Sequence, residues 1–189
     1  MGRLTGKTVL VTGASKGIGA EIARAMGREG ARLIAHYGGD RAGAEAATAG
    51  CDATLLQADL DDGEAVDRLW EAELEAAGGT LAVLVNNAGI MRQEGGIEHP
   101  LEDWERDWQD SIAVNVHAPA RLMRHAVRGW LGAGTGGAVI AVGSWVTTRG
   151  TANPGAIAYA ASKAAIAAAT KTVARNYAAR GILAYVIAP

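Results

Sequence analysis

The 189-residue chain contains no phenylalanine and a single cysteine, and its charges nearly balance at a formal net charge of −2. Because Cys51 has no second cysteine to pair with, an internal disulfide is excluded, which fits a reducing compartment. The 18 basic and 20 acidic residues lack the basic excess that binding to a phosphate backbone requires. The composition therefore argues against a nucleic-acid partner and leaves the core to Ala, Val, Leu and Ile.

Long apolar runs are also missing. The first apolar run, residues 9–11, is too short for the core of a signal peptide, and no stretch approaches the roughly 18 apolar residues of a membrane span. We therefore expect no membrane segment and a cytoplasmic location. The four histidines have no metal-ligand spacing and no paired cysteines beside them, so no metal site is predicted.

Apolar residues make up 49% of the chain, enough for one buried core, and we expect a single domain over residues 1–189. Short apolar runs alternate with longer segments of helical periodicity, which is the pattern of βαβ units. The runs predict six strands, at residues 8–12, 32–36, 54–57, 81–86, 138–143 and 183–188. Helices are predicted at residues 18–29, 42–48, 63–77, 101–131 and 158–180. This order predicts an α/β fold of the Rossmann type, a doubly wound parallel sheet in three α/β/α layers.

Proline has one informative position. Pro119 falls inside the longest predicted helix, where it lacks an N–H and clashes with the carbonyl four residues back. A break is therefore expected near residues 115–118.

The first predicted strand leads into a glycine-rich turn at residues 12–19 and then into a helix. Gly13, Gly17 and Gly19 would allow a tight turn and let a pyrophosphate approach the helix N-terminus. A purely structural turn is the alternative. The position between a first strand and a helix favours phosphate binding.

Polar residues follow two later strands. Asn86, Asn87 and Gly89 come after the fourth strand, and Ser144 comes after the fifth. Each is an ordinary turn former when taken alone. Because the carboxyl ends of parallel strands open on one edge of a sheet, we expect these groups to converge on the crevice beside the first turn.

Tyr159 and Lys163 lie four residues apart at the start of the last predicted helix, so both side chains can point into one cleft. A neighbouring cation favours the ionised form of a phenol, which suits acid–base work near neutral pH. The alternative is a solvated pair on an exposed turn, and the accompanying motifs outweigh it.

Together, the glycine-rich turn, the Asn86–Gly89 segment, Asn115, Ser144 and the Tyr159/Lys163 pair resemble, in this order, the short-chain dehydrogenase/reductases. The pattern is similar to the single-domain branch of that family, in particular to beta-ketoacyl carrier-protein reductases and to short-chain alcohol or sugar dehydrogenases.

The resemblance implies a hydride transfer between nicotinamide and a ketone or secondary alcohol, with a 3-oxoacyl thioester among the candidates. Tyr159 would be the general acid or base, Ser144 would bind the substrate oxygen, Lys163 would hold the ribose hydroxyls and Asn115 would carry a water. The implied cofactor site comprises Gly13, Ser15, Lys16, Gly17, Ile18, Gly19, His36, Tyr37, Asp59, Leu60, Asn86, Ala88, Gly89, Tyr159, Lys163 and Pro189.

Cofactor choice depends on the end of the second strand, where NAD-selecting proteins place a carboxylate. That end here carries His36 and Tyr37 followed by two glycines. Lys16 could pair with a 2′-phosphate together with His36 or Tyr37. NADP(H) is therefore expected, with NAD(H) as the alternative. A homodimer or homotetramer is implied by the resemblance. Two rival readings remain: a catalytically idle NADP-binding regulatory protein and a non-enzymatic scaffold.

The sequence departs from the family pattern in two places. Ser144 and Tyr159 are 15 residues apart where many relatives have 13, which makes Thr147 a weak substitute for Ser144. The sequence also stops at Pro189, directly after the sixth strand. We expect the apolar run before it to be buried on both faces and a lid and a seventh strand to follow in the natural protein.

Overall fold

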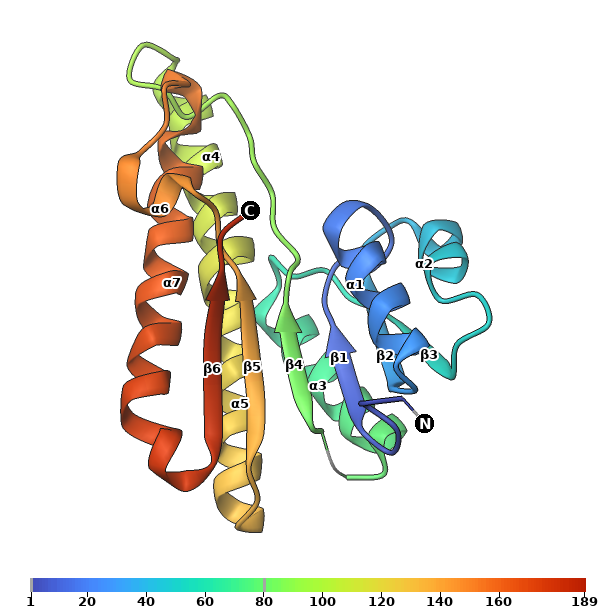
Figure 1. Cartoon of the computed structure of the whole chain (residues 1–189). Coiled ribbons are helices and arrows are strands. Elements are labelled where there is room, and N and C mark those ends of the chain that lie inside the picture. The colour runs from blue at the N-terminus through green and yellow to red at the C-terminus, as the bar shows by residue number, and fades with distance from the viewer. Residues whose placement is uncertain (1, 80) are drawn as a thin grey trace.

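The sheet of the computed structural model, which describes residues 2–79 and 81–189, has six parallel strands in the order β3-β2-β1-β4-β5-β6 (Figure 1). The strands are β1 (Thr8–Val11), β2 (Arg32–Tyr37), β3 (Ala53–Gln57), β4 (Val83–Asn86), β5 (Gly137–Val142) and β6 (Ile182–Ile187). The order reverses direction between β1 and β4, which is the switch point where such sheets bind ligands. The structure thus confirms the predicted parallel sheet of the Rossmann type.

Helices cover both faces of the sheet. On one face, side chains such as Leu10, Leu84 and Val139 pack against α3 (Gly63–Ala77), α5 (Ala118–Ala133) and α7 (Ile157–Tyr177). On the other face, the alternate side chains, among them Val9 and Val85, pack against α1 (Gly17–Arg28), and α2 (Arg41–Ala47) lies beside α1. Shorter turns are α6 (Val146–Arg149) and the 3-10 segments η2 (Pro154–Ala156) and η3 (Ala178–Arg180).

The long connection after β4 contains a widened turn at the predicted break. Helix α4 (Leu101–Ile112) continues through a π-helical turn, η1 (Ala113–His117), directly into α5. Pro119 is in the first turn of α5. Because the proline offers no N–H to the Asn115 carbonyl, the wider turn accommodates its ring without ending the helix. The position of the irregularity was predicted correctly, but the helix is not interrupted.

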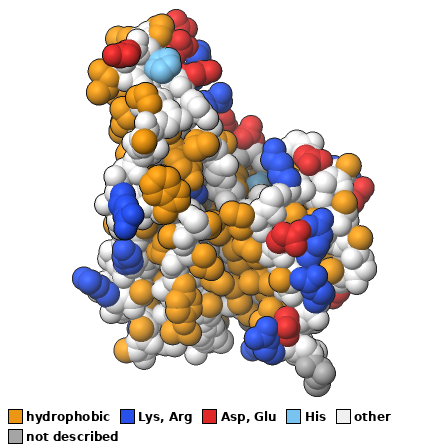
Figure 2. Space-filling model, turned by 45° about the horizontal axis from the view of Figure 1, so that its top comes forward, with side chains coloured by type: hydrophobic (Ala, Val, Ile, Leu, Met, Phe, Trp, Pro, Cys, Tyr) orange, Lys and Arg blue, Asp and Glu red, His pale blue; other side chains and the backbone are white. Residues whose placement is uncertain are grey.

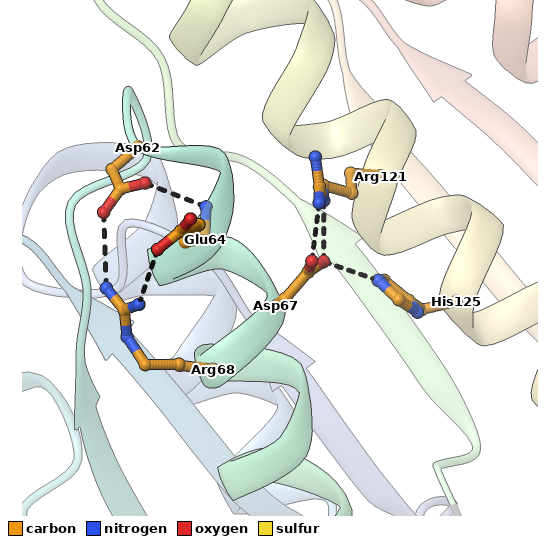
Figure 3. A network of polar contacts seen from close by, with 6 residues as sticks. All are labelled: Asp62, Glu64, Asp67, Arg68, Arg121 and His125. Atoms are coloured by element: carbon orange, nitrogen blue, oxygen red, sulfur yellow. Dashed lines mark hydrogen bonds and ion pairs between the residues drawn. The ribbon is translucent and has the colours of Figure 1, made fainter.

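Ion pairs join α3 to α5 on the surface (Figure 3). Arg121 donates to both oxygens of Asp67 at 2.6 and 2.5 Å, and His125 Nε2 lies 2.8 Å from the same carboxylate. These contacts hold the pKa of Asp67 well below its usual range. Arg68 reaches Asp62, whose other oxygen caps α3 by accepting from the Glu64 N–H.

Strand β6 differs from its predicted burial. Leu183, Tyr185 and Ile187 are 45, 53 and 49% exposed, whereas Ile182 on the opposite face is fully buried. Helix α7 packs on the buried face, and no helix of the described residues covers the other. Within the described residues, β6 is therefore covered on one face only. Within residues 2–79 and 81–189, every helix is too short or too polar to cross a membrane.

Candidate active site

The glycine-rich turn after β1 is held against the end of β4 by Thr12 and Asn87. The Thr12 hydroxyl accepts the Asn87 and Ala88 N–H groups, both at 3.0 Å, and the Asn87 amide donates to the Thr12 and Gly13 carbonyls at 2.8 and 3.1 Å. Gly13 has a φ of +66°, and a Cβ there would lie 2.9 Å from the Ala88 Cα. A Cβ on Gly19 would lie 2.1 Å from the Gly13 carbonyl oxygen. Only glycine fits at these two positions of the turn. We call the turn at residues 12–19 the glycine cradle.

A cavity of about 650 Å³ opens in front of this cradle. Ten of the residues predicted for the cofactor site line it: Gly13, Ser15, Lys16, Ile18, Gly19, His36, Asp59, Leu60, Ala88 and Gly89. Gly17 begins α1 with a φ of +55°, and Lys16 precedes it as an exposed residue. A hollow of about 840 Å³ beside β3 shares Asp59 and the two glycines after β2 with this cavity, so the two spaces adjoin. The cradle and the helix N-terminus fit a dinucleotide pyrophosphate.

His36 is not available to bind a phosphate. Its Nδ1 accepts the Gly13 N–H at 3.1 Å and its Nε2 donates to the Ala58 carbonyl at 3.1 Å, and burial lowers the pKa of the imidazole. The ring is therefore neutral at pH 7 and both nitrogens are used in supporting the turn. Tyr37 is 4% exposed and lies outside the lining of the cavity. These contacts do not support the expectation that either side chain assists Lys16.

Five further predicted residues do not line the cavity: Gly17, Asn86, Tyr159, Lys163 and Pro189. Asn86 is buried and its amide donates to the Pro119 carbonyl at 3.0 Å, so it supports the start of α5. Asn87, the next residue, lines the cavity, as expected of the groups that follow β4, although the implied cofactor site named Asn86 in its place. Pro189 also lies outside this cavity; its carbonyl accepts the Trp145 N–H at 3.3 Å.

Lys163 and Tyr159 come together on the first turns of α7. The Lys163 Nζ is 5.9 Å from the centre of the Tyr159 ring and donates to the Val142 carbonyl, at the end of β5, at 2.9 Å. The lysine is 6% exposed, and burial lowers its pKa. A Cβ on Gly89 would lie 3.1 Å from this Nζ and 3.1 Å from the Asn115 Oδ1. Gly89 and Asn115, from the connection between β4 and β5, therefore meet Lys163, from the connection between β5 and β6.

Asn115 connects the π-helical turn to its neighbours. Its Oδ1 accepts the Ile90 N–H at 2.8 Å, and its Nδ2 donates to the Ile90 carbonyl and to the Ser162 hydroxyl at 2.9 and 3.0 Å. Ser162 is fully buried and donates to the Tyr159 carbonyl at 2.8 Å. Sequence reasoning missed Ser162, although its place between Tyr159 and Lys163 on a helix was a usable signal.

Ser144 follows β5 as predicted and is 7% exposed. Its carbonyl accepts the Thr147 N–H at 3.1 Å, and the resulting turn begins α6. Ser144 is thus fixed at the carboxyl edge of the sheet, near the strand end that Lys163 also contacts.

The carboxyl edge of the sheet thus combines a glycine cradle that fits a dinucleotide with the Tyr159 phenol beside the buried Lys163 ammonium group. A Rossmann sheet with these two parts defines a nicotinamide-dependent oxidoreductase.

Comparisons with known proteins agree with this class. The short chain dehydrogenase family matches residues 7–189. The chain is 38% identical to 3beta-hydroxysteroid dehydrogenase 1 of Eggerthella lenta, with 98% of the chain and 70% of that enzyme covered. It is 36% identical to the 3-oxoacyl-[acyl-carrier-protein] reductase FabG of Staphylococcus aureus, over 97% of the chain and 73% of that enzyme. A crystal structure of a short chain dehydrogenase from Burkholderia cenocepacia in complex with NADP superposes with a TM-score of 0.86 at 36% identity, covering 99% of this chain and 75% of that one.

The chain therefore belongs to the short chain dehydrogenase family, and it is an NAD(P)-dependent oxidoreductase.

Proposed function

We propose that this chain transfers a hydride between NADP(H) and a ketone or secondary alcohol, with Tyr159 as the proton donor in reduction and the proton acceptor in oxidation. The observation that carries the proposal is the buried Lys163 ammonium group, 5.9 Å from the Tyr159 ring and beside Gly89 at the edge of the cofactor cavity. A cation in this position stabilises negative charge that develops on the phenol oxygen during proton transfer. When bound, the nicotinamide supplies or accepts the hydride.

Each neighbouring residue has a distinct task in this proposal. Lys163 uses one N–H on the Val142 carbonyl, which leaves two donors for the ribose hydroxyls. Ser144 holds the substrate oxygen near the Tyr159 hydroxyl. Asn115 has its side chain engaged by Ile90 and Ser162, and the usual α-helical partner of its backbone carbonyl is Pro119, which has no N–H, so this carbonyl is the group that holds the relay water.

NADP(H) is favoured over NAD(H) by the charge at the cradle. Lys16 lines the cavity immediately before α1, and no acidic residue lies in the first turn of that helix. Asp40 also lines the cavity, but one of its oxygens accepts the Gly43 N–H as the cap of α2. The NADP complex of the Burkholderia relative is consistent with this choice.

Two rival functions are an idle cofactor-binding regulator and a structural scaffold. Either could have lost the catalytic pair without penalty, and the chain keeps Tyr159, Lys163 and Ser144 together with the cradle. These residues support an enzyme.

Turnover of the Tyr159→Phe variant tests the proposal. Ketones and alcohols are screened by the absorbance of the reduced nicotinamide, and the best substrate is then used for kinetics. Tyr159→Phe should lose most of kcat while NADPH affinity stays nearly constant, because only the hydroxyl is removed. Tyr177→Phe, at the other end of α7, is the control. Wild-type kcat in Tyr159→Phe would refute the assignment.

Assembly and location extend the proposal. Small side chains lie along α7, with Ala165 and Ala168 exposed and Ala161, Ala164 and Ala169 half-buried. We propose that a second copy packs closely on this helix and α5 to form a cytoplasmic dimer or tetramer. Light scattering that gives a monomer mass at micromolar concentration would contradict it.

A further inference from the structure

The polar side chains beside the catalytic pair are already engaged with one another. Two connections flank Tyr159: residues 87–100 before α4 and residues 143–156 before α7. The Asn153 side-chain amide donates to the Gln93 side-chain Oε1 at 3.1 Å and joins the two connections. Arg92 pairs with Asp110 at 2.6 Å, and Glu94 lies 3.9 Å from Arg106. A substrate rich in hydroxyl groups would have to break these contacts to form its own.

Large apolar side chains on the same two connections are, by contrast, exposed. Met91 is 54% exposed and lies two residues beyond Gly89, which adjoins the Lys163 ammonium group. Trp145 is 56% exposed and directly follows Ser144, with its backbone N–H fixed to the Pro189 carbonyl. Exposed side chains of this size at a site edge mark a surface that an apolar ligand covers.

The charge on this side of the site is strongly acidic. Residues 91–110 contain seven acidic and two basic residues, and both of the basic ones, Arg92 and Arg106, are paired with carboxylates. Figure 2 shows acidic side chains gathered on the upper lobe above a surface of hydrophobic ones. A field of this sign opposes the approach of phosphorylated or carboxylated substrates.

We propose that the substrate is an uncharged, bulky and largely apolar secondary alcohol or ketone, and that Met91 and Trp145 are the residues that select it. This inference rests on the proposed function and narrows it. The two side chains would cover the carbon skeleton beside the reacting carbon, while Ser144 and Tyr159 take the single oxygen. Polyols should bind poorly because few free polar side chains remain to bond their hydroxyl groups. Anionic thioesters should bind poorly because the acidic lobe repels their charge.

Three probe ketones test the substrate class on the full chain with NADPH. They are tert-butylcyclohexanone, fructose and acetoacetyl-coenzyme A, which represent an apolar, a polyhydroxylated and an anionic substrate. We expect kcat/KM for the apolar ketone to exceed the other two by at least about tenfold, the scale on which an apolar pocket discriminates. A higher kcat/KM for fructose or for the thioester would overturn the inference and leave the proposed function standing.

Matched variants test the two residues. Met91→Gln and Trp145→Gln introduce polarity at similar size and should reduce the ratio of kcat/KM for tert-butylcyclohexanone to that for acetone by about tenfold. Met91→Leu and Trp145→Phe remain apolar and should keep the ratio within a few-fold. Ile97→Gln, at an 85% exposed residue further along the same connection, is the control.

The outcomes distinguish the role of Met91 and Trp145 from the proposed function. Ratios that stay at the wild-type value in both glutamine variants, with unchanged circular dichroism, would refute the role of Met91 and Trp145. If a glutamine variant fails to fold, its apolar counterpart decides. A fall of about tenfold in the tert-butylcyclohexanone-to-acetone ratio in Met91→Leu or Trp145→Phe would refute the role of that residue. Absence of Tyr159-dependent turnover with every probe would reject the proposed function and this inference with it.

Discussion

Glu73 offers a quantitative test of the packing between α3 and the sheet. Its side chain is fully buried in the middle of α3, and neither carboxyl oxygen has a hydrogen-bond partner within residues 2–79 and 81–189. Burial raises the pKa of this carboxyl group to about 7. The folded protein therefore holds Glu73 protonated near neutral pH, because a buried unpaired carboxylate costs far more than a buried acid.

The raised pKa makes stability depend on pH in a defined direction. The folded state binds the proton more tightly than the unfolded chain, whose carboxyl titrates near 4.5. The contribution of Glu73 is therefore fully present below pH 4.5 and is lost as the pH rises towards 7. Each pKa unit between the folded and unfolded states corresponds to about 1.4 kcal/mol. The free energy of unfolding should therefore fall by about 2.5 kcal/mol between pH 5 and pH 8 through Glu73 alone.

The assay is urea unfolding at pH 5, 6, 7 and 8, followed by tryptophan fluorescence, to which Trp70 one turn away contributes. The glutamine in Glu73→Gln does not titrate. From pH 5 to pH 8, the free energy of unfolding of the wild type should therefore fall by about 2.5 kcal/mol more than that of the variant. Comparing slopes cancels the cost of burying the amide. Glu75→Gln, at an exposed position of α3, is the control and should follow the wild type. Parallel curves for Glu73→Gln and the wild type would refute the reasoning.

Three other predictions follow from the contacts described above. Gly13→Ala should destabilise the protein by more than 1 kcal/mol, measured by urea unfolding, because its φ is +66° and Ala88 blocks a Cβ; Gly17→Ala, whose Cβ meets nothing within 4 Å, should cost about 1 kcal/mol. Equal costs would contradict the role of Ala88. Lys16→Ala should weaken NADPH binding about tenfold and leave NADH binding nearly unchanged in titration calorimetry; equal losses would exclude a 2′-phosphate contact. Asp67→Asn should lower the urea midpoint more at pH 7 than at pH 3. The low pKa of Asp67 gives a contribution to the free energy of unfolding that disappears as the pH falls. A pH-independent change would argue against the pair with Arg121.

Much of the fold was predictable because its periodicities are local. All six strands appear, each with bounds close to the predicted ones, and they form the parallel sheet that alternating strands and helices predict. The convergence of Gly89, Asn115 and Lys163 was also predictable, since the carboxyl ends of parallel strands share one edge. The π-helical form of the turn at Ala113–His117 was not, because a proline signals only that the regular hydrogen bond is missing.

The site assignments that the observed contacts do not support share one cause. Residue type showed that His36 could carry charge, but burial lowers the pKa of its imidazole. Its two ring nitrogens are occupied by hydrogen bonds with Gly13 and Ala58, which are distant in sequence. Asn86 was placed at the cofactor by motif, whereas the structure turns it to Pro119 and leaves the cradle to Asn87. Whether a polar side chain faces a ligand or the protein depends on such tertiary partners, which a single sequence does not reveal.

The same tertiary partners hold the carboxyl edge of the sheet in place without a bound ligand. Thr12 fixes the end of β4 to the end of β1, Asn115 fixes Ile90 beyond β4 to the π-helical turn, and Lys163 fixes α7 to the end of β5. Each contact joins elements that are far apart in the chain, so the positions of the cradle and of the Tyr159/Lys163 pair are set by folding. A site ordered in advance does not need to order these groups during the reaction, which is the condition under which fixed donors and a fixed phenol lower a barrier.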